Sequence, residues 1–263
     1  MTTKYVLRFT ALGYLAALLV VPVGLITYRA FSDGVGAFFG AITTPEALHA
    51  LWLTVLIALI AVPANTIFGV MCALAIVRRK FPGHGLVNSV VDLPLALSPV
   101  VVGLALVLVY GQNGWWGGAL IDNGFQVIFA LPGMVLATIF VSLPFVVREV
   151  VPVLREIGDE QEEAASTLGA SSWQTFWRVT LPAIRWGVAY GVVLTTARAL
   201  GEFGAVSVVS GRIAGRTETM TLHVEERFQA LEVQDAYAAS VVLAMLAVVT
   251  LLAMTLLRKE EHA

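Results

Sequence analysis

Cysteine is almost absent from this chain, and charged residues are scarce. The 263 residues include one cysteine, Cys72, which excludes a disulfide bond within the chain. Charged residues make up 13% of the sequence, against about 25% in soluble domains. Hydrophobic residues make up 58%, and the mean hydropathy is +0.85. Much of the chain must therefore face lipid or lie in a membrane core.

Motifs for hydrolytic and metal chemistry are also missing. The sequence has no G-x-x-x-x-G-K-[ST] phosphate-binding loop, so the chain cannot hydrolyse ATP by itself. It has no H-E-x-x-H, G-x-S-x-G or Cys/His cluster. The four histidines all lie outside the long apolar segments: His49, His84, His223 and His262. We therefore expect no catalytic residue, no metal site and no cofactor bound by this chain, and an intramembrane enzyme is disfavoured.

Six apolar segments have the length of a membrane span, for which about 20 residues are needed. The first is longer than the apolar part of a signal peptide and lacks a small-residue cleavage site, so we expect a retained span. Prolines inside several segments are tolerated where neighbouring helices satisfy the freed backbone groups. We predict an all-α membrane protein with six transmembrane helices: Phe9–Tyr28, Leu51–Val77, Ser89–Tyr110, Gln126–Val147, Ile184–Val209 and Tyr237–Leu257.

Positive charges predict the orientation of these spans. Of the 16 lysines and arginines, 11 fall on the side that carries both termini: Lys4, Arg8, Arg78, Arg79, Lys80, Arg148, Arg155, Arg178, Arg185, Arg258 and Lys259. Four fall on the other side, and Arg198 lies within a span. Because cytoplasmic loops carry the excess of lysine and arginine, we expect both termini, and the connection between the fourth and fifth spans, in the cytoplasm.

That connection has the signals of a short first helix. Asp159 followed by Glu162 predicts a capping box at its start. Ala164 and Ala165 leave its backbone open to close approach by another surface. Gly169 is suited to the left-handed residue that ends such a helix.

A second short helix is expected directly after this turn. Ser171 or Ser172 can cap its start. Three aromatic side chains at i, i+3 and i+4 form one apolar face: Trp173, Phe176 and Trp177. Leu181-Pro182 is expected to end the helix, since proline cannot continue the hydrogen-bond ladder. These residues alone leave two interpretations open, an interfacial link between spans or a docking element for a cytosolic partner.

The spacing of this connection resembles that of the permease subunits of type I ABC importers. Glu163-Ala164-Ala165, Gly169, Val179 and Leu181-Pro182 match the pattern EAA-x3-G-x9-I-x-LP, with Val179 in place of isoleucine. The similarity extends to four further runs: SPVV from Ser98, LPGMVL from Leu131, LPFVVRE from Leu143 and GEFGAVSVVSG from Gly201. Together these runs resemble the CysW-type subunits of bacterial sulfate/thiosulfate transporters.

This resemblance implies a MetI-like permease fold with a cytoplasmic coupling helix that sits in a cleft of an ATPase subunit. It implies three regions: a tail, first helix and external loop (1–48), a permease core (49–257) and a cytoplasmic tail (258–263). The residues implied in coupling are Glu162, Glu163, Ala164, Ala165, Leu168, Gly169, Leu181 and Pro182. The implied partners are a CysT-type permease, two CysA-type ATPase subunits that bind ATP and Mg, and an extracytoplasmic sulfate-binding protein, in the bacterial cytoplasmic membrane.

Two ionisable residues lie well inside the fifth apolar segment. Arg198 and Glu202 are at i and i+4, so they share one helix face. Such residues are costly in lipid, usually face the bundle interior and often pair. The pair either touches the route of the anion or only holds the helices together. With Ser98, Ser207 and Ser210, it makes up the candidate translocation pathway. Gly187 and Gly191 form a G-x-x-x-G, which predicts close helix contact in the same segment.

The expected function is therefore ATP-driven import of sulfate or thiosulfate. Bringing a dianion into a negative cell costs about 4.6 kcal/mol per 100 mV, so a passive pore would let the ion leave. A molybdate or tungstate permease of the same architecture is the nearest alternative. An ATP-independent anion channel or secondary transporter is the alternative of a different class.

Overall fold

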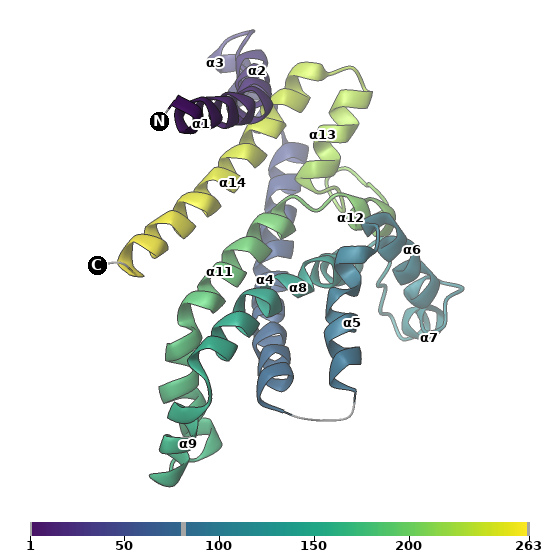
Figure 1. The fold of residues 1–263 in the computed structure, drawn as a ribbon. Helices are drawn as coiled ribbons and strands as arrows, with labels where there is room; N and C mark the ends of the chain where they lie inside the picture. The colour runs from purple at the N-terminus through teal and green to yellow at the C-terminus, as the bar shows by residue number, and fades with distance from the viewer. Residues whose placement is uncertain (1, 80–82, 262–263) are drawn as a thin grey trace.

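Helices joined by turns and irregular segments make up the described residues, 2–79 and 83–261, of this computed structural model (Figure 1). Its α-helices are α1 (Thr2–Leu15), α2 (Val21–Ala30), α3 (Val35–Ile42), α4 (Pro45–Arg78), α5 (His84–Ala96), α6 (Pro99–Tyr110), α7 (Gly117–Asp122), α8 (Leu131–Ile157), α9 (Glu160–Thr167), α10 (Ser172–Thr175), α11 (Leu181–Leu200), α12 (Gly204–Val209), α13 (Met220–Gln229) and α14 (Val233–Glu261). Two π-helical turns, η1 (Ala16–Val20) and η2 (Phe176–Thr180), continue neighbouring α-helices. The predicted all-α class is confirmed.

Four helices are long and apolar enough to cross a membrane: Val6–Ala30, Pro45–Arg78, Leu131–Ile157 and Val233–Leu252. A fifth span exists if α5 and α6, bent by 110° at their junction, count as one. By length and composition, the described residues therefore hold four or five candidate spans, and the six that we predicted are not confirmed.

The third predicted span, Ser89–Tyr110, is not a continuous helix. Helix α5 ends at Ala96, Leu97 and Ser98 are extended, and α6 starts at Pro99. The proline ring disfavours the helical conformation for the residue before it, and proline has no N–H to donate. Pro99 can therefore start α6 but cannot continue α5, which places the bend at this point.

The fifth predicted span, Ile184–Val209, is also interrupted. Helix α11 ends at Leu200, and Gly201, Glu202 and Phe203 separate it from the short helix α12. The fourth predicted span starts later than expected, at Leu131, and continues past Val147 to Ile157. Figure 1 shows α9 at one end of the long helices and α13 at the other, and we call these the α9 end and the α13 end.

Helices α4, α8 and α11 form the centre of the fold and approach to backbone contact around Val146 of α8. A Cβ atom added at Gly69 of α4 would lie 2.7 Å from the Val146 Cβ. One added at Gly191 of α11 would lie 2.8 Å from the Val146 Cα, and one at Gly187 would lie 3.1 Å from the Glu149 carbonyl oxygen. The close contact predicted for the G-x-x-x-G is confirmed.

A buried amide ties α4 to α8 near this contact. The Asn65 side chain is fully buried and donates hydrogen bonds to the Ile139 carbonyl oxygen at 3.1 Å and to the Ser142 hydroxyl at 2.8 Å. Both bonds of the Asn65 Nδ2 form only when the two helices are aligned in this way, so Asn65 favours one register between them.

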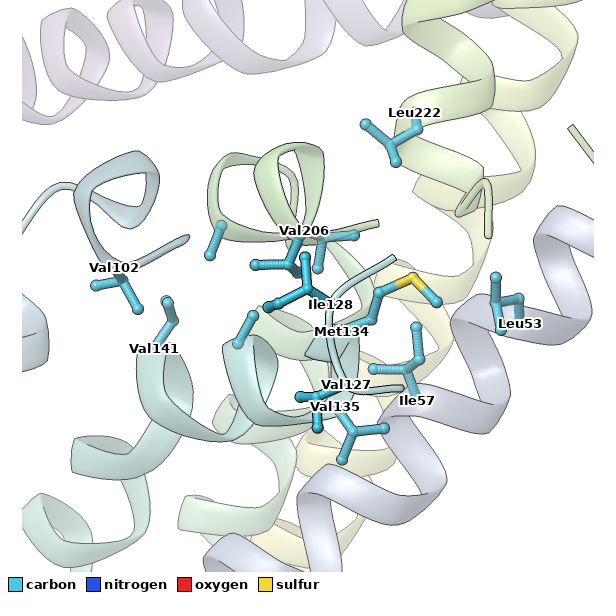
Figure 2. Close-up of a cluster of buried hydrophobic side chains, with 13 residues drawn as sticks. Leu53, Ile57, Val102, Val127, Ile128, Met134, Val135, Val141, Val206 and Leu222 are labelled. Atoms are coloured by element: carbon cyan, nitrogen blue, oxygen red, sulfur yellow. The ribbon is translucent and has the colours of Figure 1, made fainter. Parts of the chain in front are cut away.

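A second core lies toward the α13 end, where both interrupted helices join the bundle. Figure 2 shows Val102 of α6 and Val206 of α12 among the side chains of α4 and α8, with Leu222 of α13 above them. Helices α2 and α3 pack on α14 through a separate cluster: Ala30, Phe38, Ala238 and Val241.

Replacing Gly191 with alanine should destabilise the folded chain. The added Cβ would meet the Val146 Cα, which cannot turn away as the end of a flexible side chain can, and overpacking of this kind costs about 1–3 kcal/mol. Unfolding of the purified chain in detergent measures the loss. Gly24→Ala in α2, whose Cβ would meet nothing within 4 Å, is the matched control. Equal stability of the two variants would contradict the close contact.

Candidate functional site

Helix α9 ends in the left-handed turn that its sequence predicts. Gly169 has φ +81°, a conformation that favours glycine. The Ala170 N–H donates to the Ala165 carbonyl oxygen at 3.1 Å, and the Gly169 N–H donates to the Ser166 carbonyl oxygen at 3.0 Å. These two bonds form a Schellman motif, which satisfies the last carbonyl groups of the helix.

The second helix begins as predicted. Ser171 caps it: its hydroxyl accepts the Gln174 N–H at 3.3 Å, and the Gln174 side chain accepts the Ser171 N–H at 2.9 Å. Trp173, Phe176 and Trp177 have ring centroids 5.4–6.4 Å apart and form one apolar face. This face lines a groove of about 380 Å³ against α4 and α11.

Leu181-Pro182 does not end this helix, contrary to our expectation. The chain passes from α10 through the π-helical turn η2 into α11, with the Leu181 N–H bonded to the Phe176 carbonyl oxygen, five residues back. The widened turn places Pro182 in the first turn of α11, where its missing N–H breaks no hydrogen bond of that helix. The second short helix is thus continuous with a central helix.

The capping box predicted for Asp159 and Glu162 is wrong. Asp159 occupies the N-cap position, but its side chain makes no capping hydrogen bond. Glu162 instead turns toward the central helices. Its Oε2 accepts the Arg78 Nε–H at 2.9 Å, and its Oε1 accepts the Thr180 hydroxyl at 2.8 Å. A charged partner from the end of α4 outcompetes the local backbone for this carboxylate.

The Arg78 guanidinium has further partners at the end of α8. It donates to the Leu154 carbonyl oxygen at 3.0 Å and to the Gly158 carbonyl oxygen at 2.6 Å. We call Arg78, Glu162 and Thr180 the loop joint. From the sequence, Arg78 was used only as one of the positive charges that predict orientation. No local pattern links it to a carboxylate 84 residues away.

The outer side of α9 is open. The helix buries none of its residues, and Leu168 at its end is 88% exposed. Glu163 and Ala164 are exposed as well, whereas Ala165 is half-buried. A cavity of about 540 Å³ lies between this loop and α4, with the loop joint in its lining. The tip of the loop can therefore receive a partner surface without rearrangement of the core.

The two helix interruptions lie against each other. A Cβ added at Gly204, which starts α12, would lie 2.8 Å from the Pro99 Cβ at the start of α6. One added at Gly103 would lie 2.8 Å from the Ala205 carbonyl oxygen. Non-helical backbone at membrane depth is tolerated where it is buried in protein or lines a water-filled cavity, so this crossing is a candidate part of the route.

Arg198 of α11 forms an ion pair with Glu202, but Glu202 lies in the break between α11 and α12 and not on the shared helix face that we predicted. The Arg198 Nη1 lies 2.7 Å from the Glu202 Oε2, with side-chain exposures of 30% and 2%. The Glu202 Oε1 accepts the Ala205 N–H at 2.8 Å, and Thr221 of α13 donates to the Glu202 carbonyl oxygen at 2.8 Å. Glu202 thus holds the corner between α11 and α12 and ties it to α13.

The three candidate serines have separate surroundings. Ser98 is exposed and makes no capping bond at the start of α6. The Ser207 hydroxyl donates to the Gly204 carbonyl oxygen at 2.8 Å, and the buried Ser210 hydroxyl accepts the Arg212 N–H at 3.2 Å. Their place in a translocation pathway stays a prediction.

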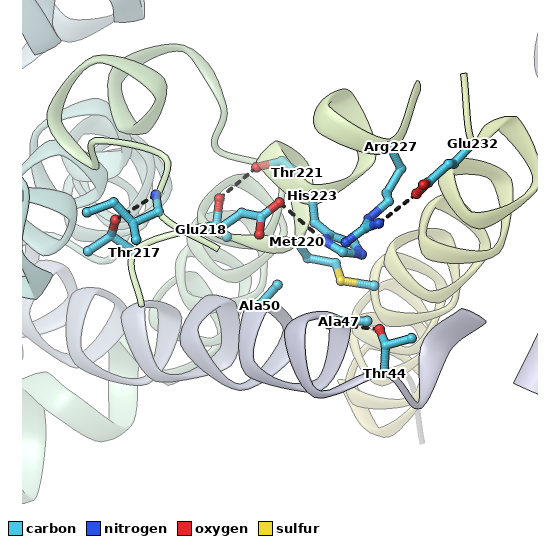
Figure 3. A network of polar contacts seen from close by, with 12 residues as sticks. Thr44, Ala47, Ala50, Thr217, Glu218, Met220, Thr221, His223, Arg227 and Glu232 are labelled. Atoms are coloured by element: carbon cyan, nitrogen blue, oxygen red, sulfur yellow. Dashed lines mark hydrogen bonds and ion pairs between the residues drawn. The ribbon is translucent and has the colours of Figure 1, made fainter. Parts of the chain in front are cut away.

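Sequence reasoning also missed a titratable cluster beside α13 (Figure 3). His223 and Glu218 are buried, with the His223 Nδ1 3.1 Å from the Glu218 Oε1. Burial raises the pKa of Glu218, but hydrogen bonds from His223 and Glu226 and nearby positive charge bring it below its ordinary value. The hydrogen bond to Glu218 raises the pKa of Glu226, and burial adds to this. The cluster connects α13 to the residues before it.

Removal of the Glu202 carboxylate should weaken the corner between α11 and α12. Glu202→Ala leaves the Ala205 N–H without its acceptor and the Arg198 guanidinium without its ion-pair partner, for which we expect a loss of about 1–3 kcal/mol in unfolding free energy. Glu202→Gln keeps an acceptor and should lose less. Thermal unfolding in detergent compares both with Glu156→Ala, an exposed glutamate on α8. A Glu202→Ala variant as stable as the control would refute the assigned role.

Comparison with known proteins identifies one family. The model of the family "Binding-protein-dependent transport system inner membrane component" matches residues 65–259. The "Sulfate transport system permease protein CysW" of Synechocystis is 55% identical over 94% of this chain and 90% of its own length. The protein of that name from Escherichia coli strain K12 is 50% identical over 92% and 84%. The Escherichia coli "Sulfate transport system permease protein CysT" is 39% identical over 89% and 85%.

Solved structures share the fold. A chain of a bacterial ABC transporter involved in the import of the acidic polysaccharide alginate superposes with a TM-score of 0.81, at 18% identity, over 98% of this chain and 95% of that one. A second structure, of a bacterial alginate ABC transporter in complex with an alginate pentasaccharide-bound periplasmic protein, gives a TM-score of 0.79 at 19% identity, over 96% of this chain and 92% of that one. At these identities the likeness concerns the fold alone.

Proposed function

Because the chain belongs to the family of binding-protein-dependent transport system inner membrane components, we propose that it is a permease subunit for ATP-driven import of sulfate and thiosulfate. The observation that carries the substrate is the identity of 50–55% to CysW proteins over most of both chains. The lower identity to CysT, 39%, favours the CysW-type position within a permease pair.

The proposed complex contains this chain, a CysT-type permease, two CysA-type ATPase subunits that bind ATP and Mg, and an extracytoplasmic sulfate-binding protein. We place it in the bacterial cytoplasmic membrane with both termini of this chain in the cytoplasm. The excess of arginine and lysine in the predicted cytoplasmic connections supports this orientation. The α9 end then meets the ATPase, and the α13 end meets the binding protein.

Helix α9 and its left-handed turn serve as the coupling element. An exposed tip without buried residues suits docking into a cleft of the ATPase, and the continuity of α10, η2 and α11 gives the docked loop a direct connection to the central helices. Energy input is required, since a sulfate dianion entering a negative cell costs about 4.6 kcal/mol per 100 mV before any concentration gradient. Nucleotide-driven closure would supply it.

The proposed route passes the crossing of the two helix breaks, with Arg198, Glu202, Ser98, Ser207 and Ser210 as its candidate residues. The ion pair leaves Arg198 little net charge with which to attract a dianion. We therefore assign Glu202 to holding the corner of the route. Of these candidates, the exposed Ser98 and the partly exposed Arg198 are accessible to an ion, whereas the Glu202 side chain is buried.

Uptake of labelled sulfate in cells that lack this gene tests the function. Restoring the gene should restore uptake, thiosulfate should compete more strongly than molybdate, and depletion of ATP should abolish import. Sulfate uptake that is indifferent to the gene, with molybdate entry lost instead, would point to the molybdate permease. Uptake that survives ATP depletion at a constant membrane potential would point to a channel or secondary transporter.

Gly169→Val should uncouple the loop from the ATPase. A β-branched residue at φ +81° is strained by about 1–3 kcal/mol, so the turn after α9 should change conformation. We expect normal membrane insertion and loss of most ATPase stimulation by the loaded binding protein, measured on the reconstituted complex. Gly169→Asn is the control, because asparagine tolerates the left-handed region. Stimulation of the valine variant equal to that of the control would contradict the assigned turn.

A further inference from the structure

The loop joint is the polar contact through which α9 meets the central helices. Both oxygens of the Glu162 carboxylate are engaged, one by Arg78 and one by Thr180. The pair is half-buried, with side-chain exposures of 16% for Arg78 and 21% for Glu162. A carboxylate held from two sides has a defined position, which an exposed glutamate on a surface helix lacks.

Three helix ends meet at this joint. Arg78 is the last residue of α4, and Thr180 directly precedes α11. The carbonyl groups of Leu154 and Gly158, which accept from Arg78, lie in the last turn of α8 and just beyond it. Carbonyl groups at a helix C-terminus lack intrahelical partners and carry partial negative charge, so a guanidinium there is favourable.

We propose that Arg78 and Glu162 act as a positioning pair that transmits movement of α9 to α4, α8 and α11 together. This inference rests on the proposed function, since it assumes that α9 is moved by an ATPase. Glu162 then acts inside the permease instead of contacting the ATPase, because its carboxylate points inward. Because a cavity separates much of α9 from α4 beside the joint, few side chains pack between them there. The polar contacts of the loop joint therefore connect α9 to α4.

A merely structural pair and a transmitting pair differ in one measurable ratio. Loss of a structural pair lowers sulfate transport and ATP hydrolysis in parallel, because fewer complexes are folded. Loss of a transmitting pair lowers the sulfate transported per ATP hydrolysed, since the ATPase still closes on α9 but the central helices follow incompletely.

The test uses the complete transporter, with both permeases, its ATPase chains and the loaded binding protein, in proteoliposomes. We expect Glu162→Gln and Arg78→Gln each to lower the sulfate-to-ATP ratio at least about fivefold, the scale of one lost charge-assisted hydrogen bond. Glu160→Gln and Arg79→Gln are the matched controls. They remove the same charges from exposed neighbouring positions and should keep the wild-type ratio.

A double-mutant cycle tests whether the two residues act together. The Arg78→Gln/Glu162→Gln double variant should lose no more of the ratio than Arg78→Gln alone, since Arg78 also holds α8, whereas additive losses would overturn the proposal. If a single variant fails to assemble, Thr180→Val removes one hydrogen bond to the same carboxylate with a smaller perturbation and should also lower the ratio. A wild-type ratio in that variant would overturn the proposal.

The outcomes separate the pair from the function on which it rests. A wild-type complex that transports no sulfate would overturn the proposed function. A wild-type complex that transports sulfate, with Glu162→Gln at the wild-type ratio or with transport and hydrolysis reduced in parallel, would overturn the positioning pair and leave the proposed function standing.

Discussion

The contact of Val146 with two glycines holds the centre of this protein together. Gly69 and Gly191 have no Cβ atoms. Because a Cβ atom at either position would collide with Val146, the two glycines are what allows α4 and α11 to approach α8 this closely. In a membrane, where lipid is as apolar as the side chains, such packing and buried hydrogen bonds drive helix association. Asn65 adds a register-specific bond across the same interface. The three helices thus share one closely packed contact, whereas the loop joint and the helix breaks lie toward their ends.

The length of the apolar segments predicted long apolar helices, but it could not predict where the helices break. The third and fifth apolar segments differ little in composition from the others, yet each is interrupted, at Ser98 and at Glu202. Pro99 starts a new helix while Pro94 stays inside α5, so proline alone does not predict where a helix breaks. The two breaks lie where α12 packs on α6, and a single sequence does not reveal that contact between distant segments.

In the loop from α9 to η2, too, local features were predicted correctly and tertiary contacts were not. Signals that operate within a few residues were predicted correctly: the left-handed Gly169 and the capping of the second helix by Ser171. Predictions for Glu162 and Pro182 failed, because a distant arginine captures the carboxylate and a π-helical turn accommodates the proline. Local rules hold where no tertiary partner competes, and the exceptions mark the places where the loop is attached to the bundle.

Helix α11 connects the two candidate sites. It begins directly after Thr180 of the loop joint and ends directly before the break that Glu202 stabilises. Its 20 residues extend over about 30 Å, so it joins two regions that lie far apart in the molecule. Gly187 and Gly191 pack it closely against α8 along the way. Under the proposed function, movement of the loop would therefore reach the crossing of α6 and α12 through α11, because α12 follows directly after the far end of this helix.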